Sequence, residues 1–239
     1  MSLEYHKQGE SVTEIWHGLT KAIELIISLD PEVIEIAWRS LRVSVTSTLL
    51  ASLFCIPLAS LIHFHRFPGK RIVVSLIQTF FSIPTVTIGL FVFVLFSQAG
   101  PLGGLNLLFT PTVMVLGQMI LISPILLGLT ISALSGVDKA ILDTARSLGA
   151  SGFQTAIVVL REVRFAVMAA VIMGFGRAIS EVGIALMIGG NIRGFTRVIT
   201  TAISLETSKG DLELALALGI ILIFIALVIN IVLNRIQQR

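Results

Sequence analysis

The sequence predicts an all-α polytopic membrane protein with five core transmembrane helices and an N-terminal amphipathic or additional helix. Of its 239 residues, 55% are hydrophobic and 13% are charged, whereas a soluble domain carries about 25% charged residues. The mean hydropathy of +0.96 is correspondingly high. The alternating pattern of about ten residues that marks a membrane β-barrel strand does not occur, so the spans are expected to be helical.

Residues 11–29 predict an amphipathic helix. Apolar residues such as Ile15, Trp16 and Leu19 recur at helical spacing, and polar or charged residues interrupt them. This pattern favours a helix at the membrane interface or packed on the bundle, and a sixth crossing stays open as the alternative. Asp30 and Pro31 are expected to end it. We therefore separate an N-terminal segment, residues 1–38, from a transmembrane domain, residues 39–239.

Five segments predict the membrane spans. Each holds about the 20 residues that cross 30 Å of hydrocarbon, and their interiors are almost free of charge. They comprise residues 43–62, 72–96, 112–134, 165–188 and 212–233. Pro57, Pro84 and Pro124 each remove an intrahelical hydrogen bond, so local kinks are expected there.

The basic residues predict the orientation. Nine Lys and Arg lie in residues 63–72, 135–164 and the C-terminal tail, whereas the opposite loops hold six over a longer stretch. By the positive-inside rule the first set is cytoplasmic, so the C-terminus is expected inside and residues 189–212 outside. The net charge of +3 is thereby explained by the lipid bilayer, and a nucleic-acid partner is not expected.

The longest cytoplasmic connection, residues 135–164, predicts two short helices joined by a glycine turn. Asp138 is a candidate N-cap, Gly149 a stop residue, and Ser151 with Gln154 a capping box for the second helix. Capping alone leaves open whether this loop docks a partner. The side chains expected at its surface are those of Ala150, Ser151, Phe153 and Gln154.

Residues 143–160 of this loop resemble the EAA loop of ABC-importer permeases, which docks on the ATPase. That pattern runs Glu-Ala-Ala, three residues, Gly, nine residues and Ile-x-Leu-Pro. Asp143, Ala145 and Gly149 are in register with it, and Val159 takes the Ile position. Arg161 and Glu162 replace Leu-Pro, and Thr144 replaces the first Ala. The second helix is therefore expected to continue into the next span without a proline break.

The resemblance extends over most of residues 39–235, and residues 176–183, 189–192 and 200–211 look most like the tungstate/molybdate branch of these permeases. It implies a type I ABC importer permease fold and a homodimer with two ATP-binding subunits and an extracytoplasmic oxyanion-binding protein. ATP is then bound by the partner, and this chain carries no Walker motif, cofactor or enzymatic activity of its own. The implied ATPase-coupling residues are Asp143, Ala145, Gly149, Ala150, Ser151, Phe153 and Gln154.

Two charged residues fall inside the fourth predicted span. A charge in hydrocarbon costs about 2.5 to 3.5 kcal/mol on insertion scales. Arg177 and Glu181 are four residues apart, so on a continuous helix they share a face and neutralise one another. Two interpretations remain open: a structural ion pair, or a positive potential from Arg177 beside an oxyanion path. A stripe of small residues on this helix predicts close helix packing, at Ala166, Ala170, Gly174 and Ala178.

Neutral polar residues in the spans are further candidates for the path or for helix packing. They are Thr85, Gln118, Ser123 and Ser180. A weakly polar lining suits an anion path, because strong binding would slow release. On the outer side, Arg193, Arg197 and Lys209 are candidate contacts for the acidic surface of a binding protein.

Other function classes are disfavoured. Cys55 is the single cysteine, and His63 and His65 are two residues apart, so no metal site is expected. A secondary transporter or channel would normally show a discontinuous helix pair or repeated halves, and the sequence indicates neither. The substrate implied by the resemblance is tungstate, with molybdate or another anion such as sulfate as the alternatives.

Overall fold

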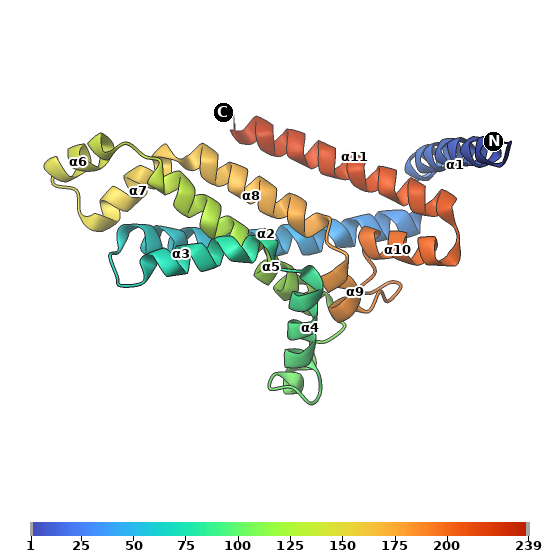
Figure 1. Cartoon of the computed structure of the whole chain (residues 1–239), viewed down its shortest axis with the longest axis horizontal. Helices are drawn as coiled ribbons and strands as arrows, with labels where there is room; N and C mark the ends of the chain where they lie inside the picture. The colour runs from blue at the N-terminus through green and yellow to red at the C-terminus, as the bar shows by residue number, and fades with distance from the viewer. Residues whose placement is uncertain (1, 238–239) are drawn as a thin grey trace.

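The computed structural model describes the backbone of residues 2–237 and the side chains of residues 13, 15–233 and 235. Within this part of the chain the elements are helices, and most of the long ones run along the length of the molecule (Figure 1). The predicted all-α class is thereby confirmed.

Three helices of the described chain are long and apolar enough to cross a membrane unbroken. They are α2 (Pro31–Phe64), α5 (Pro111–Ser135) and α11 (Leu212–Gln237), the last over Leu212–Leu233. Pro57 and Pro124 lie inside α2 and α5, which continue through them. Counting each bent helix pair as one span raises the number to five, the number predicted.

α2 begins well before the predicted span. The Asp30 side chain accepts the N–H groups of Glu32 and Val33, both at 3.0 Å, and Pro31 lies in the first turn, where its missing N–H costs nothing. The proposed boundary between residues 38 and 39 therefore lies within a continuous helix. The helices α1 and α2 are instead separated at Leu29 and Asp30.

The second and fourth spans are broken, which corrects the expectation of continuous helices. α3 (Lys70–Thr79) and the short helix η1 (Phe80–Ser82) meet α4 (Thr85–Phe96) at 101°, and α8 (Arg164–Ile179) meets α9 (Gly183–Gly189) at 57°. A hydropathy pattern shows how long an apolar segment is, but it does not show whether the helix axis bends within that segment. The expectation that discontinuous helices are absent was therefore wrong.

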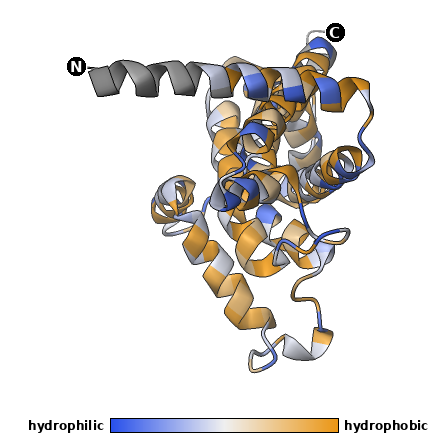
Figure 2. Cartoon of the chain, turned by 90° about the vertical axis from the view of Figure 1, so that its right-hand side faces the viewer, coloured by the Kyte–Doolittle hydropathy of each residue, from blue (hydrophilic) through white to orange (hydrophobic). Residues whose placement is uncertain are grey.

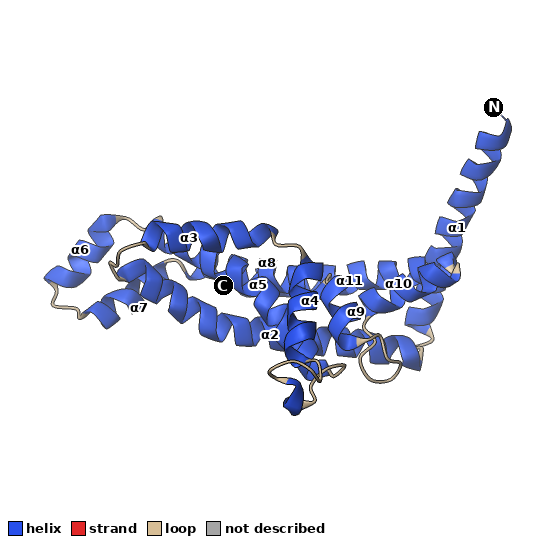
Figure 3. Ribbon diagram, turned by 60° about the horizontal axis from the view of Figure 1, so that its bottom comes forward, coloured by secondary structure: helices blue, strands red, loops and turns tan. Residues whose placement is uncertain are grey.

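The larger bend turns α4 away from the bundle (Figures 1 and 3). α4 is apolar on most sides, as its colouring in Figure 2 shows. It contacts the bundle mainly by packing against α9. Gly89 permits this contact, because a Cβ there would lie 2.9 Å from the Met187 sulfur and 3.4 Å from the Ile184 backbone. Elsewhere α4 leaves Val86 and Phe91 exposed.

The described core has two parts. The larger cluster joins α2, α4, α5, α8 and α9, and includes Met114, Ile122, Ile184 and Ile188, all fully buried. The smaller cluster joins the N-terminal parts of α2 and α11 to α1 (Ser2–Ile27) and α10 (Ile199–Lys209). The N-terminal helix thus packs on the bundle.

α1 is not among the helices that pass the length and hydropathy test for a span. Its Ala22 is fully buried in the smaller cluster, and Gly18 lies against Leu216 of α11. Trp16 and Ile27 are exposed. One face therefore packs while apolar residues remain outside, the pattern predicted for an amphipathic helix.

Candidate functional site

The loop after α5 folds into two short helices, α6 (Lys139–Ser147) and α7 (Gly152–Glu162). The Asp138 carboxylate accepts the Ala140 N–H at 2.9 Å and caps α6. After α6 the chain turns through Gly149, whose φ of +82° is readily adopted by glycine alone. These caps confirm the predicted helix, glycine turn and helix.

α7 starts with the predicted capping box. The Gln154 N–H donates to the Ser151 hydroxyl oxygen at 3.3 Å, and the Ser151 N–H donates to the Gln154 side-chain oxygen at 2.8 Å. At its other end only Val163 separates α7 from α8. The path from the loop into the span is therefore nearly continuous, as expected without a proline.

The tip of this helical hairpin exposes large apolar side chains. Leu148 is 82% exposed and Phe153 is 76% exposed. Between α6 and α7 lies a hollow of about 380 Å³, and its lining includes Ala145 and Val158. Such exposure is a feature of surfaces that a partner covers. Leu148 was missed by the sequence analysis, although its place directly before Gly149 made it part of the turn.

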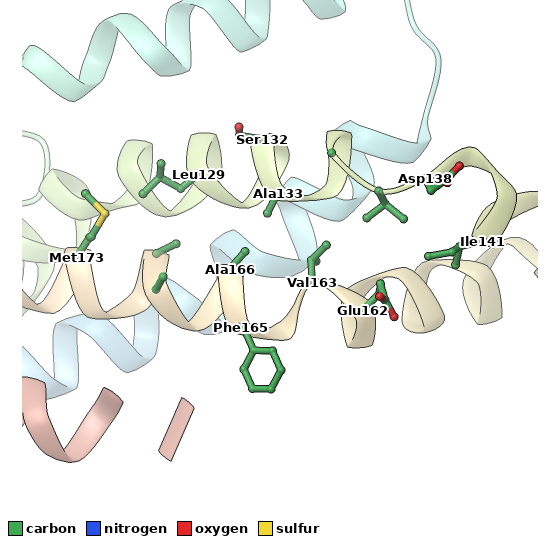
Figure 4. Close-up of a pocket in the computed structure, with 14 residues that line it drawn as sticks. Leu129, Ser132, Ala133, Asp138, Ile141, Glu162, Val163, Phe165, Ala166 and Met173 are labelled. Atoms are coloured by element: carbon green, nitrogen blue, oxygen red, sulfur yellow. The ribbon is translucent and has the colours of Figure 1, made fainter. Parts of the chain in front are cut away.

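A groove of about 720 Å³ leads from the hairpin along the bundle between α5 and α8 (Figure 4). Its lining combines small side chains, such as Ala133 and Ala166, with larger apolar ones such as Met173. Asp138 and Glu162 lie at the end near the hairpin. The Phe165 ring points away from α5 in this view. The hairpin and the N-terminal half of α8 therefore share one open surface.

The break between α8 and α9 is built around Glu181. This carboxylate accepts from the Arg177 guanidinium at 2.8 Å and from the Ile184 N–H at 3.0 Å, so it also caps α9. The Thr200 hydroxyl donates to the Glu181 carbonyl at 2.8 Å. The predicted pair forms, but Glu181 lies beyond the end of α8, so the two residues do not share a continuous helix.

Arg177 and Glu181 differ in burial. The Glu181 side chain is 2% exposed, whereas that of Arg177 is 35% exposed. The neighbouring surface of α8 is open, because a Cβ at Gly176 would meet nothing within 4 Å and Met173 and Ser180 are exposed. Arg177 thus carries its charge on an open and mostly small-residue surface of α8.

Of the neutral candidates, Thr85 is brought to the same break. A Cβ added to Gly183 would lie 3.1 Å from the Thr85 hydroxyl and 3.3 Å from a Glu181 carboxylate oxygen. Gln118 is buried in the core and accepts from the Ser47 hydroxyl of α2 at 3.0 Å. Ser123 donates to the Met119 carbonyl of its own helix at 2.6 Å.

Ser180 also bonds to its own helix, donating to the Gly176 carbonyl at 2.8 Å. Gln118 and Ser123 thus form hydrogen bonds within the bundle, whereas Thr85 and Ser180 adjoin the charged pair.

The three cations predicted to contact a binding protein are paired within the chain. Arg193 donates to both carboxylate oxygens of Glu32, at 2.9 and 2.5 Å, and Arg197 approaches the same group at 3.6 Å. The hydrogen bond and the negative charge of Glu32 raise the pKa of Arg193. Lys209 pairs with Glu206 of α10 at 2.8 Å. Two of the three predicted contact residues thus meet at the start of α2.

Residues 55–239 match the family described as binding-protein-dependent transport system inner membrane component. This match covers well over half of the chain. The chain belongs to this family. It is accordingly a multi-pass inner-membrane permease, and the hairpin of α6 and α7 is the segment in which the EAA-loop resemblance was found.

Curated relatives narrow the branch. The permease is 40% identical to the tungstate uptake system permease protein TupB of Peptoclostridium acidaminophilum, over 94% of this chain and 99% of that protein. It is 37% identical to TupB of Campylobacter jejuni, over 94% of each chain. The molybdate/tungstate transport system permease protein WtpB of Pyrococcus furiosus is 34% identical over 67% of this chain and 62% of that protein. The resemblance to the tungstate/molybdate branch is confirmed.

Solved structures confirm the type I importer permease fold. A chain of the bacterial alginate ABC transporter, in complex with an alginate pentasaccharide-bound periplasmic protein, superposes with a TM-score of 0.77 at 18% identity, covering 96% of this permease and 88% of that chain. A chain of the MetNI methionine ABC transporter, in an inward-facing conformation, gives 0.71 at 16% identity, covering 88% and 97%. Permease subunits of this kind are not themselves enzymes.

Proposed function

We propose that this permease is the membrane subunit of an ATP-driven importer that carries an oxyanion into the cytoplasm. Tungstate is the substrate that we propose. The observation that carries the proposal is the identity of 40% and 37% to two tungstate uptake permeases over 94% of the chain. Molybdate and sulfate are the alternative substrates, because both are tetrahedral dianions like tungstate, and molybdate is also nearly equal to it in size.

The α6 and α7 hairpin docks on a separate ATP-hydrolysing subunit. Its supports are the register of Asp143, Ala145 and Gly149 with the EAA loop and the exposure of Leu148 and Phe153 at the tip. A homodimer of permeases then carries two such subunits. This arrangement puts the hairpin, and with it the C-terminal end of α11, on the cytoplasmic side, in agreement with the basic loops.

The oxyanion path follows the open surface of α8. Arg177 supplies the positive charge, Thr85 and Ser180 adjoin it, and the small residues of the groove leave room below. Because Glu181 neutralises much of that charge, the anion is attracted without being held tightly. The two helix breaks, which adjoin one another beside Thr85 and Glu181, are the joints that closure of the ATPase dimer moves.

An extracytoplasmic oxyanion-binding protein docks on the outer face. The loop that carries Arg193 and Arg197 is fixed to α2 by Glu32 and by the Arg39 guanidinium, which donates to the Arg197 carbonyl at 2.9 Å. Lys209 lies on α10 of the same side. This preorganised surface presents three cations, each beside a carboxylate of the chain, to an acidic partner.

The test is a complete assembly in proteoliposomes: the permease, its ATPase and its binding protein. ATP hydrolysis is measured with tungstate, molybdate and sulfate in turn. Stimulation by tungstate at the lowest concentration is expected. Equal stimulation by an unrelated substrate, such as an amino acid, would sink the oxyanion assignment.

Docking is tested separately with a single cysteine. Ser151→Cys, in a Cys55→Ser background, is expected to crosslink to the ATPase in a nucleotide-dependent way. Thr46→Cys on the outer half of α2 is the negative control. Failure to crosslink at Ser151, Phe153 and Leu148 alike would refute the docking of the hairpin.

The two broken spans favour one competing function, a secondary transporter, because discontinuous helices frame its substrate site. That function requires no ATPase. Oxyanion uptake by the permease alone, driven by an ion gradient, would decide for it, whereas uptake that depends on ATP and the second subunit supports the importer.

A further inference from the structure

A third cavity, of about 820 Å³, lies at the inner ends of α2 and α5, beside the start of α3. Its polar lining consists of Arg66, Lys70, Arg71, His63 and Ser135, with Ser75 at one side. None of the proposed functional residues belongs to it. This basic pocket therefore needs an explanation of its own.

The charge of the basic pocket is not balanced by the chain. Within the described structure, Arg66 and Arg71 have no ion-pair or hydrogen-bond partner, and Lys70 donates to the carbonyl oxygens of His63 and His65 at 2.5 and 3.3 Å. The sequence contains no Asp or Glu between Glu35 and Asp138. The lining of the pocket thus presents three cations and no carboxylate.

The basic pocket also has an apolar side. Phe67, Val74 and Ile131 complete its wall, and α3 buries none of its ten residues. Ile72 and Leu76 are 66% and 51% exposed on that helix. Charged groups at the start of α3 are thus followed directly by an exposed apolar surface.

We propose that the basic pocket binds the phosphate group of an anionic phospholipid of the inner leaflet. Arg66 and Arg71 have free guanidinium groups that match phosphate oxygens in a bidentate manner, and Lys70 is held in place as a third cation. The acyl chains lie along the exposed apolar side of α3. The volume is ample for a phosphoglycerol headgroup, and the position agrees with the cytoplasmic assignment of this end of the bundle.

The experiment is native mass spectrometry of the full chain, purified in detergent and supplied with equal amounts of phosphatidylglycerol and phosphatidylcholine. Retention of phosphatidylglycerol over phosphatidylcholine is expected. The variant Arg66→Gln/Arg71→Gln is expected to lose this preference, by about fivefold for each cation removed. A matched control, Arg161→Gln/Arg235→Gln, removes the same charge from elsewhere on the inner side and keeps the preference.

Two further arms identify the source of the anion. If 10 mM inorganic phosphate leaves the bound lipid in place, the ligand of the basic pocket is a lipid headgroup. If phosphate displaces the lipid, the pocket is a binding site for a soluble anion, and the lipid assignment is overturned. Arg66→Lys/Arg71→Lys keeps the charge and is expected to retain the lipid, which separates binding from folding. The proposal is overturned if both lipids are retained equally, or if the matched control loses as much of the lipid preference as the Gln variant. It is also overturned if the Gln variant no longer binds the ATPase subunit while its lipid binding is unchanged.

Discussion

The carboxylate of Glu181 lies 2.8 Å from the guanidinium of Arg177 and bridges the break between α8 and α9. The same carboxylate caps α9 through the Ile184 N–H. One buried side chain therefore neutralises a charge in the membrane region and fixes the direction of the next helix. These two functions can be separated by substitution.

Glu181→Ala is expected to destabilise the permease by about 1 to 3 kcal/mol, because the Ile184 N–H and Arg177 both lose their acceptor. The loss falls short of that for a fully buried pair, since Arg177 is partly exposed and can reach water. Glu181→Gln keeps an acceptor oxygen and is expected to lose less. Thermal unfolding in detergent measures both variants, and equal losses would contradict the capping role.

Arg177→Met is expected to lower oxyanion transport more than it lowers folded yield. The double variant Arg177→Met/Glu181→Gln removes the unpaired buried carboxylate, so it should recover the yield while transport stays low. Transport is measured in proteoliposomes and yield by size-exclusion chromatography. Recovery of both quantities in the double variant would restrict the pair to a structural function.

Gly149→Ala is expected to cost about 1 kcal/mol at the turn between α6 and α7, because alanine resists a φ of +82°. The hairpin tip then shifts, and ATP-coupled transport falls. Gly149→Asn, which tolerates this conformation better, should retain more activity. Gly104→Ala on the outer side, with nothing within 4 Å of the added Cβ, is the control. Normal coupling in Gly149→Ala would contradict a need for this turn.

The hairpin was predictable from the sequence because its determinants are local. Each cap acts on a helix that starts within three residues of the capping side chain, as Asp138, Ser151 and Gln154 show. Gly149 lies just beyond the end of α6 and forms the turn after it. The spans were predictable as apolar runs for the same reason. The chain positions of the hairpin and of the five spans thus followed from short-range patterns.

The helix breaks depend on distant partners and were not predictable in that way. Only Pro84 marked one of them, and nothing local marks residues 180–182. There the backbone is held by Thr200, which lies 19 residues from Glu181. Likewise Glu32 and Arg193 are 161 residues apart, so the sequence could name the cation but not the carboxylate that binds it.

Arg193→Glu is expected to leave stability nearly unchanged, because the Arg193–Glu32 ion pair is exposed and screened by solvent. Stimulation of ATP hydrolysis by the binding protein should nevertheless fall several-fold, since a cation facing an acidic partner becomes an anion. Lys21→Glu, at a comparable exposed pair on α1, is the control. Similar losses in both variants would remove Arg193 from the docking surface.

Two interior helix glycines provide the last prediction, since alanine favours a helix over glycine by up to about 1 kcal/mol. At Gly117 of α5 the added Cβ would lie 2.6 Å from Ile188 and 2.7 Å from Ile184. Both isoleucines are fully buried, so neither can move aside cheaply, and Gly117→Ala is expected to lower stability by about 1 to 3 kcal/mol.

At Gly176 of α8 the added Cβ meets nothing within 4 Å, so Gly176→Ala should keep or raise the melting temperature. If the open surface of α8 lines the oxyanion path, the larger Gly176→Leu should lower transport while leaving that temperature intact. A stability loss in Gly176→Leu equal to that in Gly117→Ala would mean that this surface is packed in the working assembly. The path would then have to be sought on another helix.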